Sequence, residues 1–244
     1  MPTFKLIVAY DGTPYHGWQI QPGLPTIQGL LQKHLARILG HPVEVYGAGR
    51  TDAGVHAKGQ AAHFRTSSAM EVKVIGRALN ATLPRDIVIR KIEEVSPDFH
   101  AQFGAKGKEY RYYIFNHPVR SPFYRRYSLF VPISLDLDHM REALSHFVGT
   151  HDFYSLSVAS EDKENTVRTI TRAELIQEGD FLTIILEGNG FLHRMVRRIV
   201  GTMLEVGKGK MPIDAIPDIL KTRDKRLSGG SVPPNGLFLV SVRY

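Results

Sequence analysis

The sequence contains no cysteine. This excludes disulfide bonds, zinc sites with thiolate ligands, iron–sulfur clusters and cysteine nucleophiles, so any catalysis must use other groups. The eleven histidines form no His-Glu-x-x-His pattern and no evident ligand set, and we expect no metal site. A Walker loop and the glycine spacing of a dinucleotide-binding fold are also missing, so we expect no nucleotide cofactor.

Long apolar segments are missing as well. No apolar run is long enough to span a bilayer. The first ten residues alternate between apolar and polar side chains, without the positively charged segment and apolar core of a signal peptide. We therefore expect a soluble, cytoplasmic protein that has no membrane partner.

Acidic residues are fewer than basic ones. The 244 residues include 24 Asp and Glu against 31 Lys and Arg, which gives a formal net charge of +7. Such a protein attracts polyanions, and nucleic acid is the leading candidate partner. A generally basic surface with no specific partner is the simple alternative. With 43% hydrophobic and 23% charged residues, the whole chain is expected to fold.

The first half of the chain has the pattern of alternating strands and helices. Apolar residues two apart predict a strand from Phe4 to Tyr10, and helical spacing predicts a helix from Ile27 to Ile38. Thr26 is suited to cap that helix and Gly40 to end it. Further predicted elements are strands at Val43–Val45, Ala61–Phe64 and Ile87–Ile92 and a helix at Val72–Leu79.

The second half repeats this order. A hairpin turn at Gly179 and Asp180 joins two predicted strands. The predicted elements are strands at Lys108–Asn116, Val167–Gln177, Phe181–Glu187 and Leu237–Val242, and helices at Leu137–Val148, Phe191 to about Val206, and Ile213–Leu220.

The repeated order predicts an α+β protein of two split-βαβ, ferredoxin-like units with mostly antiparallel sheets. We place the boundary near residues 105 to 107, with residues 1–105 in the first unit and 106–244 in the second. The units are expected to face a central basic cleft.

Basic residues are clustered in the second half. The clusters are Lys106, Lys108 and Arg111, then Arg120, Arg125 and Arg126, and finally Lys221, Arg223, Lys225 and Arg226. Any one of them is more often a solvated face than a binding site. Together, around a cleft, they favour a surface that follows the phosphates of a folded RNA.

The segment Gly49–Ala57 is the most unusual stretch in the chain. Its plain explanation is a surface turn, because Asp and Gly are turn formers and Arg50 could pair with Asp52. The functional alternative is that small residues let a substrate approach while Asp52 projects from a tight loop between two strands. A carboxylate flanked by a guanidinium stays ionised at neutral pH and can serve as a nucleophile or a base.

Gly49–His56, with the sequence Gly-Arg-Thr-Asp-Ala-Gly-Val-His, closely resembles the catalytic motif of the TruA-type tRNA pseudouridine synthases. Further segments resemble that family's motifs in the same order along essentially the full chain: Tyr10–Gly12, Tyr15–Gln19, Thr26–Gly29, Lys108–Tyr112, His151–Phe153, Phe191–Arg197 and Gly236–Val240. Separate motifs that agree in one order argue against a chance similarity.

The resemblance implies a pseudouridine synthase fold and the isomerisation of uridine at positions 38, 39 and 40 in the anticodon arm of transfer RNA. It implies that Asp52 is the catalytic nucleophile or general base, and that Tyr110 packs against the target base. Arg197 would keep Asp52 ionised, Arg50 would help to hold the displaced nucleotide or its phosphates, and Leu237 would close the pocket. A homodimer that works without a cofactor is also implied.

Tyr110 has a structural explanation as well. Tyr110, Tyr112 and Ile114 share one strand face, and aromatic stripes usually pack in a core. The place of Tyr110 at the start of its strand instead favours exposure at a rim.

Arg197 could likewise belong to a plain helix surface. The buried stripe of its predicted helix consists of apolar residues, and Arg194, Arg197 and Arg198 lie off it. We expect these three arginines on one exposed face, where they would suit phosphate or carboxylate binding.

Two other classes of protein share some of these features. A non-catalytic RNA-binding module also has βαββαβ order and a basic, aromatic sheet, but Lys108–Phe115 lacks the Gly-Phe-Gly-Phe core of the aromatic RNA-binding motif. Such modules also have no use for a carboxylate like that of Asp52. A retaining glycoside hydrolase or nucleosidase would use the carboxylate but explains the basic charge poorly.

Overall fold

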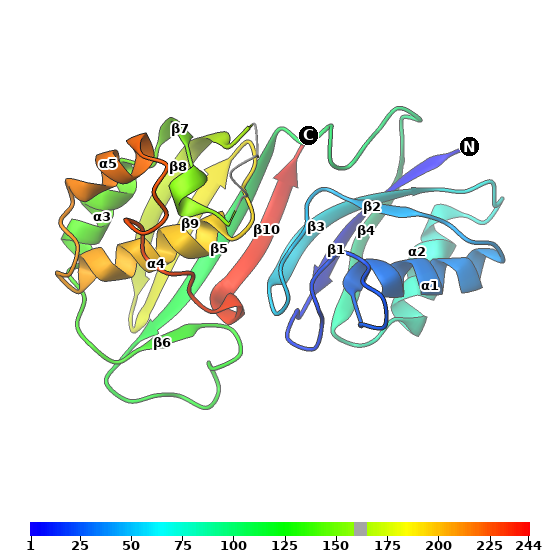
Figure 1. The fold of residues 1–244 in the computed structure, drawn as a ribbon. Helices are drawn as coiled ribbons and strands as arrows, with labels where there is room; N and C mark the ends of the chain where they lie inside the picture. The colour runs from blue at the N-terminus through cyan, green and yellow to red at the C-terminus, as the bar shows by residue number, and fades with distance from the viewer. Residues whose placement is uncertain (159–164) are drawn as a thin grey trace. The chain divides into compact units, whose positions relative to one another are not determined.

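The computed structural model describes residues 1–158 and 165–244. The chain folds as two compact units (Figure 1). The first consists of Met1–Lys106 together with Phe238–Tyr244, and the second of Gly107–Leu237. Both units combine helices with mostly antiparallel strands, which confirms the predicted α+β class.

The first unit contains a sheet in the order β4-β1-β3-β10. Its central strand pairs are antiparallel, and β10 runs parallel to β3 through the partners Phe238 and His56. The short strand β2 also pairs with β3. The bounds are Thr3–Tyr10 for β1, Val45–Gly47 for β2, His56–Arg65 for β3, Ile87–Val95 for β4 and Leu237–Arg243 for β10.

Two helices, α1 (Ile27–Leu39) and α2 (Val72–Thr82), lie side by side against this sheet (Figure 1). The hydroxyl of Thr26 accepts a hydrogen bond from the Gly29 amide, and Gly40 ends α1 with a φ of 77°. Both predicted caps are therefore confirmed.

The second unit contains a sheet in the order β5-β9-β8-β7, in which neighbours are antiparallel, and β6 lies parallel to β5. Gly179, with a φ of 58°, provides the predicted tight turn between β8 and β9. The bounds are Gly107–Asn116 for β5, Leu129–Val131 for β6, Gly149–Asp152 for β7, Val167–Glu178 for β8 and Phe181–Gly188 for β9.

Helices α3 (Leu137–Ser145), α4 (Met195–Gly207) and α5 (Ala215–Lys221) belong to the second unit. Two short 3₁₀ helices, η1 (Tyr154–Leu156) and η2 (Pro234–Gly236), connect its elements. Helices α3 and α4 approach closely, since a Cβ atom built on Gly207 would lie 2.5 Å from the sulfur of Met140.

The predicted start of α4 at Phe191 is wrong. The helix begins at Met195, because Arg194 adopts a left-handed conformation with a φ of 60° that a helix cannot continue through. Phe191–Arg194 therefore forms a loop, although its apolar residues continue the spacing of the helix.

Among residues 1–158 and 165–244, no helix is both long and apolar enough to cross a membrane.

Candidate active site

Asp52 lies in the loop between β2 and β3, as predicted. The backbone closes a turn there, in which the Val55 amide donates to the Asp52 carbonyl oxygen at 3.1 Å. Gly54 occupies this turn with a φ of 76°, a conformation that side chains with a Cβ atom rarely adopt. The side chain of Asp52 is partly exposed. The loop therefore presents a carboxylate from a fixed turn.

The N-terminal loop from Tyr10 to Trp18, which we call the clasp, holds the Asp52 loop by its backbone. The Trp18 amide donates to the Thr51 carbonyl oxygen at 3.1 Å, and the Gly54 amide donates to the Tyr15 carbonyl oxygen at 3.2 Å. These bonds lie on either side of Asp52 in the chain and restrict its backbone.

A buried side-chain contact adds to the clasp. The hydroxyl oxygens of Tyr10 and Thr51 lie 2.8 Å apart, and both side chains are buried. Burial raises the pKa of the Tyr10 hydroxyl, which is therefore neutral at physiological pH and free to act as a hydrogen-bond donor. Thr51 is the direct neighbour of Asp52, so this contact fixes the residue that precedes the carboxylate.

Two glycines let the clasp come this close. A Cβ atom on Gly12 would lie 2.0 Å from the Val55 carbonyl oxygen, and one on Gly17 would lie 2.5 Å from the Thr51 carbonyl oxygen. Neither distance is possible for real atoms. The two backbones are therefore in direct contact, with no side chain between them.

His56, the first residue of β3, contacts the clasp through its side chain. Its Nδ1 atom lies 3.1 Å from the Gly12 amide nitrogen and 3.1 Å from Oδ1 of Asp11. When Nδ1 carries no proton it accepts the Gly12 bond, and when protonated it can donate to Asp11. The imidazole ring also stacks on Phe238 of β10, with 4.5 Å between ring centroids.

Residues of the clasp were not assigned a role from the sequence, apart from a resemblance to a family loop. The signal that could have identified them is the density of glycines near a buried tyrosine and tryptophan. Their partners lie about forty residues further along the chain, as the separation of 41 between Tyr10 and Thr51 illustrates.

Arg50 is exposed, and among the described residues its side chain forms neither an ion pair nor a hydrogen bond. A surface ion pair between Arg50 and Asp52, the plain explanation of this motif, is therefore not formed. Its guanidinium remains available for another anion.

Tyr110 belongs to β5 in the second unit and is buried, with 8% of its surface exposed. Its ring meets Phe191 edge to face, with 5.1 Å between centroids. The expected exposure at a rim is therefore wrong. The reason is that the Phe191–Arg194 loop, which replaces the predicted first turn of α4, packs against the strand.

Arg197 is buried in α4, so the expected exposed face of three arginines is also wrong. Its Nε atom donates to the Val232 carbonyl oxygen at 2.7 Å, and the Val232 amide donates back to the Arg197 carbonyl oxygen at 3.3 Å. The neighbouring Arg198 donates to the Lys225 carbonyl oxygen and to Ser228. Of the three, Arg194 alone is exposed.

Leu237 follows the segment that Arg197 binds. The Tyr112 hydroxyl donates to the Pro233 carbonyl oxygen at 2.8 Å, and a Cβ atom on Gly236 would meet the Tyr112 ring at 2.8 Å. Leu237 itself is 5% exposed. The second unit thus brings together the strand of Tyr110, the helix of Arg197 and the segment before Leu237, while Asp52 and Arg50 belong to the first unit.

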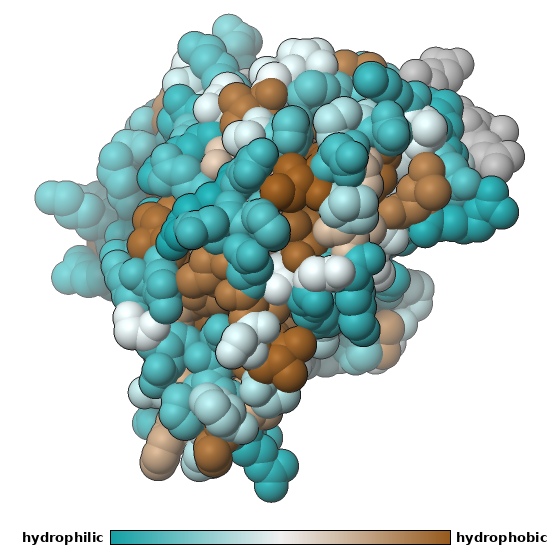
Figure 2. All heavy atoms as spheres, turned by 90° about the vertical axis from the view of Figure 1, so that its left-hand side faces the viewer, coloured by the Kyte–Doolittle hydropathy of each residue, from teal (hydrophilic) through white to brown (hydrophobic). Residues whose placement is uncertain are grey.

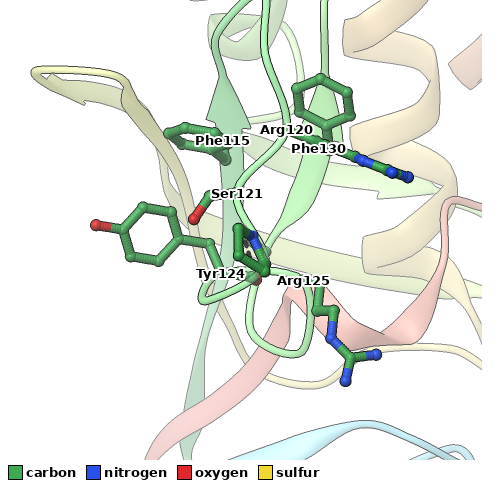
Figure 3. Close-up of a pocket in the computed structure, with 8 residues that line it drawn as sticks. Phe115, Arg120, Ser121, Tyr124, Arg125 and Phe130 are labelled. Carbon is green, nitrogen blue, oxygen red and sulfur yellow. Dashed lines mark hydrogen bonds between the residues drawn. The ribbon is translucent and has the colours of Figure 1, made fainter.

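A cavity of about 460 Å³ lies between the loop that follows β5 and the strand itself. Figure 3 shows Phe115, Tyr124 and Phe130 around it, with the guanidinium of Arg125 directed away from the rings. Beside it Phe123 is 82% exposed. Arg120 and Arg125 of the second basic cluster line this cavity, whereas Asp52, Arg50, Tyr110, Arg197 and Leu237 do not.

The basic clusters differ in how far acids neutralise them. Arg223 pairs with Asp152 at 2.7 Å, and Arg226 pairs with Asp224 at 2.7 Å. Hydrogen bonds from Arg226 lower the pKa of Asp224 to about 2.

Figure 2 shows one face of the molecule, on which hydrophilic side chains predominate and apolar ones are exposed between them.

No group of three or more His, Asp and Glu side chains suited to hold a metal ion occurs within residues 1–158 and 165–244.

Comparison with known proteins identifies the family. The model of a tRNA pseudouridine synthase family matches residues 6–104 and 143–244. A tRNA pseudouridine synthase A of Exiguobacterium sp. is 46% identical over 100% of this chain and 98% of its own length. One of Acetivibrio thermocellus is 44% identical over 100% of both chains. Among solved structures, one titled "Crystal structure of the archaeal box H/ACA sRNP Nop10-Cbf5 complex" is 14% identical, with a TM-score of 0.38, over 82% of this chain and 44% of that chain.

These matches include the Asp52 loop, the clasp and α4. The chain therefore belongs to the tRNA pseudouridine synthase family and has the pseudouridine synthase fold.

Proposed function

We propose that this chain isomerises uridine to pseudouridine at positions 38, 39 and 40 of transfer RNA, with Asp52 as its catalytic carboxylate. The observation that carries the proposal is the clasp, which holds the motif Gly49–His56 so that Asp52 projects from a fixed turn. Family membership supplies the reaction, and the basic charge of the chain suits its substrate.

The reaction breaks the bond between ribose C1′ and uracil N1 and forms a bond between C1′ and C5. The C5 proton passes to the solvent, and N1 takes up a proton. The isomerisation is neither an oxidation nor a hydrolysis, so the proposed enzyme works without a redox cofactor, a nucleotide or a metal ion.

Asp52 can enter this reaction by three routes. Its carboxylate can attack C1′, add to C6 of the base, or abstract a ribose proton. All three need an ionised carboxylate beside the glycosidic bond. A carboxylate whose backbone is fixed on both sides is suited to each of them, because the enzyme then spends little binding energy on orienting it.

The remaining site residues are proposed to act on the substrate. Tyr110 would pack against the target base, its orientation set by Phe191. Arg197 would stabilise the carboxylate of Asp52, with its own guanidinium oriented by Val232. Arg50 would bind the displaced nucleotide or its phosphates, and Leu237 would close the pocket.

The substrate is proposed to be the anticodon arm of transfer RNA. A uridine in a paired stem cannot present its glycosidic bond, so it must be flipped out at a cost of roughly a few kcal/mol. Contacts of basic side chains with the RNA backbone offset this cost. Activity at neighbouring positions requires recognition of RNA shape more than of base edges.

A cytoplasmic homodimer is part of the proposal. Transfer RNA is present in the cytoplasm, and exposed apolar side chains such as Phe123 and Val119 are typical of surfaces that partner proteins cover. Sedimentation of the purified chain tests the dimer directly. A monomer at all micromolar concentrations would contradict it.

The experiment that tests the reaction uses transfer RNA carrying tritium on uridine C5. We expect the native protein to release the label to water, and Asp52→Asn to release none while it retains RNA affinity. Glu94→Gln, an exposed change on β4, serves as the matched control and should react normally. Normal turnover by Asp52→Asn would remove this carboxylate from the mechanism.

The same assay separates the two other classes of protein. A non-catalytic RNA-binding module would bind the RNA and release no label. A nucleosidase or glycoside hydrolase would release free uracil, which chromatography distinguishes from tritiated water.

A further inference from the structure

Two cations of the second unit, Lys108 and Arg168, lie together at one end of its sheet. Lys108 and Ile170 are both paired with Gly188, on β5 and β8 respectively, and Arg168 precedes Ile170 by two residues. Paired residues and alternate residues share a face of a sheet. Lys108 and Arg168 therefore project from the same face, which is also the face of Tyr110.

Two glycines lie beside this pair. Gly188 separates the two strands and contributes no side chain. Gly190 follows in the next turn, and a Cβ atom built on it would lie 3.7 Å from Nε of Arg168. The Arg168 side chain thus packs against the backbone of Gly190, with no side chain between them.

Neither cation is neutralised by a residue that the structure describes. In the part of the chain that the structure describes, Lys108 and Arg168 have no acidic partner. Burial lowers the pKa of both side chains, and the charge of Arg168 lowers that of Lys108 further. The two like charges are therefore close and partly desolvated, an arrangement that costs folding free energy.

The opposite face of the same sheet is different. Arg111 pairs with Glu109 at 2.7 Å, and Arg172 pairs with Glu174 at 2.6 Å. These arginines belong to the same two strands as Lys108 and Arg168. Among the described residues, the two cations without an acidic partner thus lie on the face of Tyr110, whereas the arginines of the opposite face are paired.

The donors that remain fit a tetrahedral oxyanion. Nη1 of Arg168 donates to the carbonyl oxygens of Val167 at 2.6 Å and Asn165 at 3.3 Å. The edge formed by Nε and Nη2 has no acceptor among the described residues, nor does Nζ of Lys108. A guanidinium edge gives two parallel hydrogen bonds to a phosphate, and an ammonium adds a third.

We propose that Lys108 and Arg168 together bind one backbone phosphate of the RNA substrate, an inference that rests on the proposed function. Lys108 lies two residues along β5 from Tyr110, a distance of roughly 7 Å on a strand. A nucleotide whose base meets Tyr110 has its sugar–phosphate backbone within reach of such a site. The phosphate relieves the repulsion between the two cations. RNA binding therefore offsets the folding free energy that the unneutralised pair costs.

Equilibrium binding of transfer RNA tests the pair. We expect Lys108→Gln and Arg168→Gln each to weaken binding about tenfold, the size of one charge-assisted contact. The slope of log affinity against log salt should fall by roughly 0.7 to 0.9 for either variant. Because both cations hold one phosphate, the double variant should lower the slope little further. Arg172→Gln, which removes an arginine neutralised by Glu174, is the matched control and should bind as the native protein does.

Thermal unfolding distinguishes phosphate binding by the two cations from a role in stabilising the fold. Removing one of two like charges should leave Tm unchanged or raise it, although RNA binding falls. Added inorganic phosphate should raise the Tm of the native protein more than that of either variant. If added inorganic phosphate raises the Tm of the native protein and of both variants equally, the phosphate binds elsewhere, and the pair is refuted as a site for free anions.

The outcomes separate this inference from the proposed function. If the native protein releases tritium but both variants keep the native affinity and salt slope, the phosphate site is refuted and the enzyme stands. If the native protein releases none but the variants bind RNA less tightly, the phosphate site stands and the enzyme is refuted. Variants with a clearly lowered Tm would show that the two cations stabilise the fold, contrary to the proposal.

Discussion

The hydroxyls of Tyr10 and Thr51 lie 2.8 Å apart in the interior of the first unit, one residue away from the carboxylate proposed to be catalytic. This contact joins the end of β1 to the loop after β2. Its position means that the fold of the N-terminal strand and the orientation of Asp52 depend on one another. Changes at Tyr10 should therefore affect both stability and turnover.

Tyr10→Phe removes one partner of this buried pair and leaves the Thr51 hydroxyl without it. We expect the free energy of unfolding to fall by about 1–3 kcal/mol, and single-turnover label release to slow by about tenfold as the Asp52 loop loosens. Urea unfolding and the tritium assay measure the two effects.

The double variant Tyr10→Phe with Thr51→Val tests whether the contact itself is responsible. It should be less destabilised than the sum of the single variants, because both polar partners are then gone. Tyr124→Phe, at a half-exposed tyrosine of the second unit, is the control and should change neither quantity. If the loss of stability in the double variant equals the sum of the losses in the single variants, the two hydroxyls are not coupled.

The sequence predicted the elements whose signals are local. The hairpin of β8 and β9 follows from alternating residues around Gly179 and Asp180, and α1 follows from its apolar spacing and caps. The strands β6 and β7 were not predicted, because three or four residues are too few to show a period. Pairing of β10 with β3 is not a local property and could not be predicted either.

The candidate site shows the same difference between features with local sequence signals and features that depend on distant residues. The loop of Asp52 was identified by its resemblance to a motif of consecutive residues. The burial of Tyr110 and Arg197 was not predicted, because it depends on the Phe191–Arg194 loop and on Val232, which lies 35 residues from Arg197. Arg168 was not predicted as a site residue, because its position near Lys108 depends on the pairing of the three strands β5, β9 and β8.

Gly17→Ala tests whether direct backbone contact positions Asp52. The new Cβ atom would lie 2.5 Å from the Thr51 carbonyl oxygen, and the φ of 87° disfavours alanine. We expect the free energy of unfolding to fall by about 1–3 kcal/mol and label release to slow by more than about thirtyfold.

Gly23→Ala is the matched control for this change. Its φ of 72° is similar, but nothing lies within 4 Å of the added atom. It should lose about 1 kcal/mol from the backbone conformation alone and react normally. Equal losses of activity in the two variants would mean that the close approach at Thr51 has no part in positioning the carboxylate.

His63 makes the stability of the first unit depend on pH. It is buried on β3, accepts a hydrogen bond from the Ala101 amide at 3.1 Å and meets His100 edge to face. Burial, followed by the charges of His100 and Arg65, lowers the pKa of His63 to about 4. The folded state therefore keeps this ring neutral where the unfolded chain already binds a proton.

The sign of the effect follows from that difference. Above about pH 6.5 the ring is neutral in both states and contributes no pH dependence. As pH falls from about 6.5 towards 4, only the unfolded state takes up the proton, so the free energy of unfolding falls by about 1–3 kcal/mol. His63→Gln cannot take up a proton and should lose less stability over this interval than the native protein. Urea unfolding at pH 7 and pH 4.5 compares His63→Gln with the native protein. An identical pH dependence of the native protein and His63→Gln would show that this ring is protonated equally in the folded and unfolded states.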